Sequence, residues 1–173
     1  MDRDVLQFYK GSADKYPGRG VGEHVNSRGD YLELSQITNW RRMFSDMWNE
    51  HVQVDGYTYG SHHHAFQAAK FWTAGEDEIA FNFTIESNSK LGLGTSLDAY
   101  RARKTKMLSG AQMEKWEKNK GAAKDKIYQR KYCPGSAALR ALMATGSALL
   151  VSKPPRGKRI ECTRLMGIRD KAK

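Results

Sequence analysis

The sequence contains little that would direct the protein to a membrane or into a secretory route. No apolar run approaches the roughly 18 residues that a membrane-spanning helix needs. The start, MDRDVLQFYK, lacks the basic end and the apolar stretch of a secretion signal. We therefore expect an intracellular protein without a membrane partner. These patterns do not distinguish the cytoplasm, an organelle and a virus particle.

Cysteine is also scarce, with only Cys133 and Cys162 in 173 residues. Their spacing matches no zinc-ligand motif, and in an intracellular protein we expect both to be reduced thiols that face the core. The glycine-rich phosphate fingerprints G-x-x-x-x-G-K-S/T and G-x-G-x-x-G are absent, and so is the G-x-S-x-G motif of serine hydrolases. Nothing in the sequence therefore points to a P-loop nucleotidase or to nucleophilic catalysis by serine or cysteine.

Acidic residues are few in the C-terminal part of the chain. Residues 101–131 hold eleven Lys and Arg against three Asp and Glu, and residues 152–173 hold eight against two. The first 100 residues hold nine against fourteen, so the formal charge of +10 comes from the second part of the chain. A basic surface of this kind suits a nucleic acid, a phosphorylated small molecule or an acidic protein. A solvated basic helix face explains the same pattern equally well.

The rest of the composition is typical of one folded domain. Hydrophobic residues make up 39% of the chain, which is enough for one core, and we predict a single domain over residues 1–173 with a basic segment at 152–173. The spacing of apolar residues predicts strands near 5–9 and 148–151, and helices over 30–48, 109–131, 136–144 and around 165–169. Residues 86–96 are expected to form a loop, whereas residues 78–85 fit a helix or a strand.

The clearest local signal lies in residues 52–72. Apolar and polar residues alternate on both sides of Asp55-Gly56, which is the sequence of a two-residue hairpin turn. Ser61 then stands where its side chain can cap a helix that runs to about Trp72. The segment therefore predicts a hairpin followed by a helix.

That helix opens on His62, His63 and His64. Adjacent helical residues point about 100° apart, so three in a row do not converge on one ion, and no metal site is predicted. We expect one histidine to pack beneath the hairpin, one to face solvent and one to look into a cleft at the helix N-terminus. The unpaired amides and partial positive charge of a first helical turn make such a cleft suitable for an anion.

A second candidate anion site is the loop from Lys10 to Gly22. It is rich in Gly, Lys and Arg, and Lys10, Lys15 or Arg19 could hold a phosphate. Because the loop matches neither phosphate fingerprint, a flexible surface loop is the favoured interpretation.

Four blocks occur in order along the chain: F-Y-K-G-S-A-D-K at 8–15, M-F-S-D-M-W at 43–48, V-D-G-Y-T-Y-G-S-H-H-H-A-F-Q-A-A-K-F at 54–71 and L-R-A-L-M-A-T-G-S-A-L-L-V at 139–151. In order and spacing, over most of the chain, they resemble the YbiA-like, or NADAR, proteins. The ending P-P-R-G-K-R-I-E-C-T-R-L-M-G-I-R is similar to the branch found in large DNA viruses and some eukaryotes. The resemblance implies an α+β fold that is mostly helical, with a small β-sheet.

The resemblance also implies a chemistry. Characterised members of the family cleave N-glycosidic bonds in phosphoribosyl or ADP-ribosyl compounds, including a riboflavin-pathway intermediate and ADP-ribosylated guanine. Such cleavage passes through a cationic ribosyl centre, where a carboxylate stabilises positive charge and activates water. The implied ligand is therefore ADP-ribose or a ribose phosphate, and no cofactor is expected.

The family pattern T-V-E-H-A-F-Q aligns with residues 61–67. His64 and Gln67 match, but His63 replaces the family's glutamate, and a neutral imidazole cannot supply negative charge opposite a ribosyl cation. The family's S-N-F motif becomes Ser45-Asp46-Met47. From this alignment His63 and Asp46 are the candidate catalytic residues. The candidate substrate-binding residues are Ser12, Trp48, His64, Gln67 and Lys70.

Two interpretations follow. In the first, the protein is an N-glycosidase with a modified site that uses Asp46 or another acid. In the second, the fold is a scaffold with a degenerate site, and the basic surface binds a nucleic acid or an acidic protein in a larger assembly such as a ribonucleoprotein or virus particle. Losing the central carboxylate should remove several kcal/mol of transition-state stabilisation, which favours the second interpretation.

Overall fold

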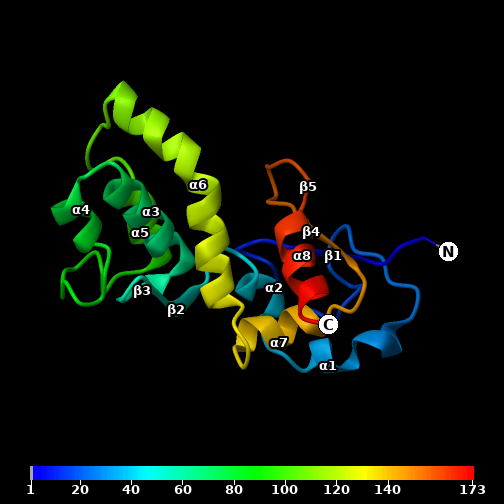
Figure 1. Ribbon diagram of the computed structural model, residues 1–173. Coiled ribbons are helices and arrows are strands. Elements are labelled where there is room, and N and C mark those ends of the chain that lie inside the picture. The colour runs from blue at the N-terminus through cyan, green and yellow to red at the C-terminus, as the bar shows by residue number, and fades with distance from the viewer. Residues whose placement is uncertain (1) are drawn as a thin grey trace. The chain divides into compact units, whose positions relative to one another are not determined.

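The computed structural model describes residues 2–173. These residues form two compact units. Residues 46–131 make up one of them, here called the central unit, and the residues up to Ser45 together with 132–173 make up the other, the terminal unit. Figure 1 labels the helices and strands of both. No helix in the described part of the chain combines the length and the apolar character needed to cross a membrane.

The terminal unit contains a three-stranded sheet. Its strands are β1 (Val5–Phe8), β4 (Leu149–Ser152) and β5 (Ile160–Glu161), in the order β1-β4-β5. β1 pairs with β4 in parallel, although more than 140 residues separate Val5 from its partner Leu149, and β5 runs antiparallel to β4. Leu6 and Leu150 are fully buried on this sheet. The two predicted strands are confirmed, whereas the two exposed residues of β5 carry no apolar pattern to predict a strand.

The helices of the terminal unit are short: η1 (Arg28–Tyr31), α1 (Leu32–Ser35), α2 (Trp40–Met43), α7 (Ala137–Met143) and α8 (Thr163–Lys171). The prediction of one helix over residues 30–48 is therefore wrong. Asn39 has a φ of 58°, and an α-helix does not continue through a residue in this left-handed conformation. The two helices predicted near the C-terminus are confirmed. Within residues 2–173, neither Cys133 nor Cys162 forms a disulfide, and both are half-buried rather than set in the core.

The central unit begins with the predicted hairpin of β2 (Asn49–Val54) and β3 (Tyr57–Ser61). Its two turn residues, Asp55 and Gly56, have φ angles of 51° and 86°. Positive φ at both positions is the conformation of a type I′ turn, whose twist matches that of the paired strands. Val54 consequently pairs with Tyr57 across the turn.

Four helices complete the central unit: α3 (His62–Thr73), α4 (Asp77–Phe81), α5 (Ser96–Ala102) and α6 (Gly110–Lys131). α3 packs against each of the other three, and Phe71 and Phe83 are fully buried in the core that it shares. The predicted helix over 109–131 is confirmed as α6, where Ser109 and Gln112 cap the first turn reciprocally and Met113 is 40% exposed. α5 begins at the end of the segment expected to be a loop.

The structure thus has the predicted α+β class and is mostly helical, although it contains two small sheets instead of one. The predicted single domain over residues 1–173 stays a prediction. The candidate site depends mainly on the junction of β3 with α3 and on the face of α6 that packs against α3.

Candidate functional site

The start of α3 is held in place by His64. The Ser61 hydroxyl oxygen accepts a hydrogen bond from the His64 backbone N–H at 3.1 Å, and the same oxygen lies 2.8 Å from Nδ1 of the His64 ring. Nε2 of that ring lies 3.1 Å from the Leu91 carbonyl. A carbonyl only accepts, so Nε2 carries the proton and Nδ1 accepts from the Ser61 hydroxyl. His64 is fully buried, and both of its ring nitrogens have partners within the central unit.

His62 is buried behind this helix start, with 2% of its surface exposed. Its ring packs on Tyr128 at a centroid distance of 4.7 Å. Neither ring nitrogen has a hydrogen-bond partner among residues 2–173, although Nδ1 lies 3.7 Å from the Asp46 carboxylate. Burial lowers the pKa of His62 to about 4, against the opposing pull of Asp46, so the ring is neutral at pH 7.

Asp46 carries the negative charge of this region. Its Oδ1 accepts a hydrogen bond of 2.8 Å from the Tyr128 hydroxyl, and its Oδ2 lies 3.3 Å from Nζ of Lys124. Burial by itself would raise the pKa of Asp46, but His62, Lys124 and Lys131 together with the Tyr128 hydrogen bond outweigh it and hold the pKa at about 2. The carboxylate is therefore ionised at neutral pH, while 30% of the side chain remains exposed.

His63 lies directly beside Asp46. Its backbone N–H donates to the Asp46 carbonyl at 3.1 Å. The Gln67 side-chain nitrogen lies 3.3 Å from Nε2 of the His63 ring, and because an amide nitrogen only donates, Nε2 is the acceptor. Burial lowers the pKa of His63 to about 4 in spite of Asp46, which acts to raise it. The structure thus brings together Asp46, His63 and Gln67 from the predicted set.

Lys131 adds a buried cation close to Asp46. It is 7% exposed, and burial lowers its pKa to about 8, while Asp46 and Glu50 act in the opposite direction. Lys124, Tyr128 and Lys131 were not among the predicted site residues. They follow one another at intervals of four and three, which places them on one face of α6, and this spacing was the signal that could have found them.

The remaining predicted residues are Lys70, Trp48 and Ser12. Lys70 donates a hydrogen bond of 2.7 Å to the Arg103 carbonyl, and burial lowers its pKa. Trp48 is half-buried just before β2. Ser12 belongs to the terminal unit, where its hydroxyl accepts from the Tyr9 backbone N–H at 2.9 Å and it helps to line a hollow of about 170 Å³.

The histidine triplet differs from the expectation in one respect. His62 and His64 are both buried and His63 is half-buried, so the expectation that one of them faces solvent was wrong. In the part of the chain that the structure describes, no group of three or more His, Cys, Asp or Glu residues is arranged to hold a metal ion.

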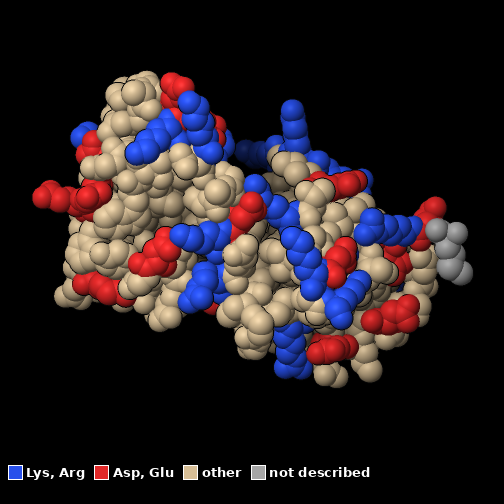
Figure 2. Space-filling view, in the orientation of Figure 1, with Lys and Arg blue, Asp and Glu red and all other residues tan. Residues whose placement is uncertain are grey.

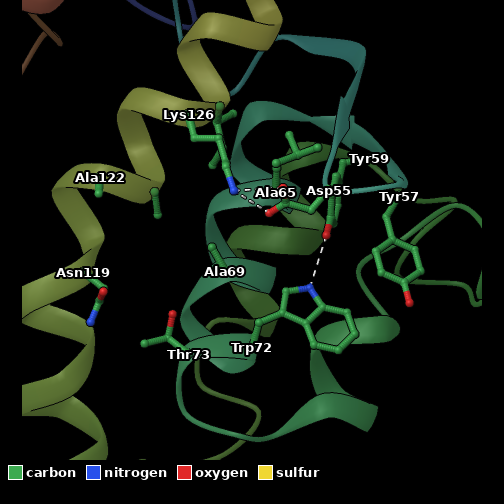
Figure 3. A pocket seen from close by; sticks show the side chains of 13 residues that line it. Asp55, Tyr57, Tyr59, Ala65, Ala69, Trp72, Thr73, Asn119, Ala122 and Lys126 are labelled. Carbon is green, nitrogen blue, oxygen red and sulfur yellow. Dashed lines mark hydrogen bonds and ion pairs between the residues drawn. The ribbon is translucent and has the colours of Figure 1, made fainter.

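A separate cavity of about 370 Å³ lies between α3 and α6. Figure 3 shows its walls, where Trp72 donates from Nε1 to the Tyr59 hydroxyl at 3.2 Å and Lys126 forms an ion pair with Asp55 at 2.8 Å. Small side chains, Ala65 and Ala69 among them, leave the space open. None of the predicted catalytic or binding residues lines this cavity.

Comparison with known proteins identifies the fold. Searches against protein-family models and against curated proteins found no match. Among solved structures, the NMR structure of E. coli YbiA matches 99% of this chain and 86% of its own, with a TM-score of 0.56 and 19% sequence identity. The chain has a YbiA-like fold. At this identity the likeness shows the fold alone, so membership of the NADAR family and of its viral-type branch stays a prediction.

Proposed function

We propose that the central unit is an N-glycosidase that hydrolyses the N-glycosidic bond of a phosphoribosyl or ADP-ribosyl compound, with Asp46 as its carboxylate. The observation that carries this proposal is that residues 46 and 63 are neighbours, joined by the 3.1 Å hydrogen bond from the His63 N–H to the Asp46 carbonyl. The family pattern has asparagine at the first position and glutamate at the second. Here they are aspartate and histidine, so the carboxylate lost from α3 is replaced on the adjoining segment.

The charge states suit this role. Asp46 is ionised at neutral pH and partly exposed, so it offers negative charge to a ribosyl cation. With a pKa of about 2 it is a weak base, and its contribution would be electrostatic stabilisation more than proton removal. His63 is neutral, and its Nε2 is a hydrogen-bond acceptor that is bonded to Gln67 in this structure. In the reaction, the same Nε2 would accept a hydrogen bond from the attacking water and orient it.

Lys124 supplies the complementary charge for the substrate phosphate. It is 31% exposed and lies 3.3 Å from the Asp46 carboxylate. A phosphate bound by Lys124 would compete with Asp46 for that ammonium group and leave the carboxylate free to face the ribose. The ion pair would then be the resting arrangement of the site, which substrate binding opens.

The test is to incubate the protein with ADP-ribosylated guanine nucleotides and with phosphoribosylamino-pyrimidines, and to measure release of the free base by chromatography. Asp46→Asn should lower the rate by at least about 100-fold, as removal of one stabilising group from a transition state does. Asp55→Asn is the matched control, because Asp55 is also an aspartate paired with a lysine of α6, and its rate should stay within about twofold of the wild type.

Two results would overturn the proposal. One is the absence of base release from both substrates by the wild-type protein. The other is an Asp46→Asn variant that is as active as Asp55→Asn. If the wild type is inactive and His63→Glu creates activity, the site is degenerate and the scaffold interpretation stands.

A second candidate function is binding to a nucleic acid in a larger assembly. Several α6 lysines are paired with acids, at 2.9 Å for Lys118 with Glu114 and 2.6 Å for Lys120 with Glu117. Figure 2 shows blue and red side chains next to one another near the first turns of α6. The exposed cations of the turn between β4 and β5 have no such acidic partner within residues 2–173; they are Arg156, Lys158 and Arg159.

This contrast points to the β4–β5 turn, and not to α6, as the basic binding surface. Replacing its three cations by glutamine should weaken binding to a single-stranded RNA and reduce the dependence of that binding on salt. Lys118→Gln with Lys120→Gln is the control and should change binding little. Equal losses from the two variants would argue against a defined surface on the turn.

A further inference from the structure

We propose that the segment 15–28 of the terminal unit binds a diphosphate group in a basic hollow. The hollow has a volume of about 810 Å³ and is lined by Lys15, Tyr16, Arg19 and Arg28. Three of its four lining residues are cations and none is acidic. All four lining residues belong to the terminal unit, whereas Asp46 and His63 belong to the central unit.

The three cations differ from those of α6 in their surroundings. Lys15, Arg19 and Arg28 are exposed, and no ion pair joins any of them to an acid in the described part of the chain. This distinguishes them from Lys118 and Lys120 of α6, which have acidic neighbours. Like charges that share one hollow raise its positive potential, and a bound polyanion lowers it.

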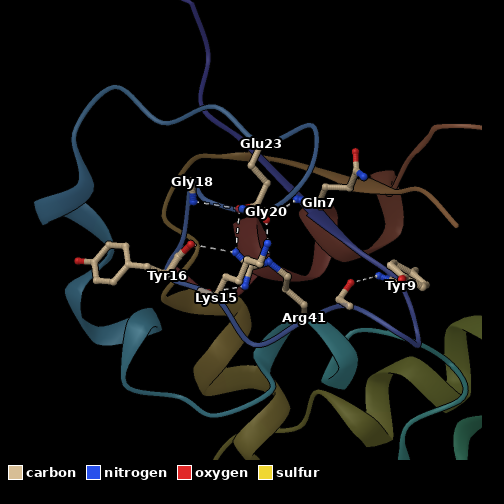
Figure 4. Close-up of polar contacts among 9 residues, drawn as sticks. Gln7, Tyr9, Lys15, Tyr16, Gly18, Gly20, Glu23 and Arg41 are labelled. Atoms are coloured by element: carbon tan, nitrogen blue, oxygen red, sulfur yellow. Dashed lines mark hydrogen bonds and ion pairs between the residues drawn. The ribbon is translucent and has the colours of Figure 1, made fainter. Parts of the chain in front are cut away.

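The backbone that carries these cations is fixed from inside by a buried ion pair. Arg41 binds both carboxylate oxygens of Glu23 at 2.8 Å, and the two side chains are 3% and 0% exposed. The Glu23 carboxylate accepts the backbone N–H groups of Gly18 and Gly20 at 2.9 Å each. Figure 4 shows these contacts converging on Glu23 and Arg41. These contacts disagree with the interpretation favoured from the sequence, in which the loop from Lys10 to Gly22 is flexible.

Two further contacts tie the cation-bearing positions themselves. The Arg41 guanidinium donates to the carbonyls of Lys15 and Tyr16, and the Tyr16 hydroxyl donates to the Arg28 carbonyl at 3.1 Å. The backbone of Lys15 and Arg28, and that of Gly18 and Gly20 on either side of Arg19, is thus fixed before any ligand binds. A site that is already ordered loses less conformational entropy on binding.

Phosphate chemistry fits this hollow better than a single carboxylate does. Guanidinium groups bind phosphate oxygens through paired N–H donors, and the hollow offers two of them together with an ammonium group. Three cations exceed what one carboxylate needs and suit two linked phosphates. A diphosphate group occurs in nucleoside diphosphates and in inorganic pyrophosphate, and the test distinguishes these two sources from each other.

The experiment is calorimetric titration of the full chain with pyrophosphate, with ADP and with a single-stranded RNA. The test variant is Lys15→Gln with Arg19→Gln and Arg28→Gln. The control variant removes three other exposed cations of the same unit, Arg164→Gln with Lys171→Gln and Lys173→Gln. We expect Kd for pyrophosphate to rise at least tenfold in the test variant and to stay within twofold of the wild type in the control. Tighter binding of ADP than of pyrophosphate would identify a nucleotide as the source.

Three outcomes would overturn the proposal: no binding of pyrophosphate or ADP by the wild type, equal weakening in both variants, or binding of RNA alone. Circular dichroism checks that the test variant is folded, which is expected because the replaced side chains are exposed. Calorimetry with pyrophosphate needs no release of a base, so a failure here and a failure of the proposed glycosidase are separable.

Discussion

Replacing Arg41 by glutamine should lower the free energy of unfolding of the terminal unit by about 3–5 kcal/mol. In the wild type the Arg41 guanidinium neutralises Glu23, whose side chain is completely buried. The variant leaves that carboxylate with backbone N–H donors from Gln7, Gly18 and Gly20 but without a cation. The variant also frees the carbonyls of Lys15 and Tyr16, but these loop residues are exposed or half-buried, so water can bind their carbonyls instead. The uncompensated buried charge is therefore the main source of the loss.

A matched pair on the surface shows the size of the burial effect. Lys126 and Asp55 also approach to 2.8 Å, but their side chains are 55% and 65% exposed. Solvent already stabilises both charges there, so Lys126→Gln should cost no more than about 1 kcal/mol. The double variant Glu23→Gln with Arg41→Gln should be less destabilised than Arg41→Gln alone, since it contains no unpaired buried charge.

The assay is urea-induced unfolding followed by circular dichroism, combined with hydrogen exchange of the backbone amides that bond to Glu23. Arg41→Gln should shift the unfolding midpoint down and speed exchange at Gln7, Gly18 and Gly20. A loss below about 1 kcal/mol, equal to that of Lys126→Gln, would refute the reasoning, because it would mean that the buried pair behaves like a solvated one.

Further predictions concern single positions. Ser61→Ala should lower the free energy of unfolding by at least about 1 kcal/mol in urea titrations, since it removes the cap of α3; a neutral result would contradict that role. Gly92→Ala should lower the free energy of unfolding by about 1–3 kcal/mol in the same assay, because its methyl group would overlap the Thr84 carbonyl. Gly110→Ala has open space around it and should be neutral or stabilising. Equal effects of the two substitutions would count against the overlap. The free energy of unfolding should fall as the pH drops from 6.5 towards 4, because His62 and His63 have a pKa of about 4 in the folded protein and the unfolded chain binds more protons in this range. His63→Gln should lose less of this free energy over the same pH range. Identical slopes of free energy against pH for the variant and the wild type would refute the assignment.

Much of the local structure follows from short stretches of sequence. The Asp55-Gly56 turn needs positive φ at both residues, and these residue types tolerate it, so the hairpin and its register could be predicted. The caps at Ser61 and Ser109 were predictable for the same reason, because a cap involves only residues three apart. The break at Asn39 was missed, since the apolar spacing through residues 30–48 continues across it although the backbone does not.

The candidate site shows where local patterns stop being informative. The resemblance named Asp46 and His63 as the candidate catalytic residues, and the structure adds that their backbones are hydrogen-bonded. The charge state of Asp46 depends on Lys124 and Tyr128, which are about 80 residues away and approach it only because α6 packs against α3. Electrostatic effects act through space and vary with burial, so the pKa of about 2 could not be inferred from neighbours in sequence.

The sequence by itself determined the β2–β3 hairpin and the starts of α3 and α6, because caps, turns and apolar periodicity act between residues a few positions apart. It also determined which residue types were available, including a histidine where the family pattern has glutamate and an aspartate where it has asparagine. Tertiary structure alone decided that Glu23 and Arg41 form a buried pair and that Asp46 is ionised beside two lysines. Burial and the approach of distant charges set both outcomes, and neither quantity exists until the chain has folded.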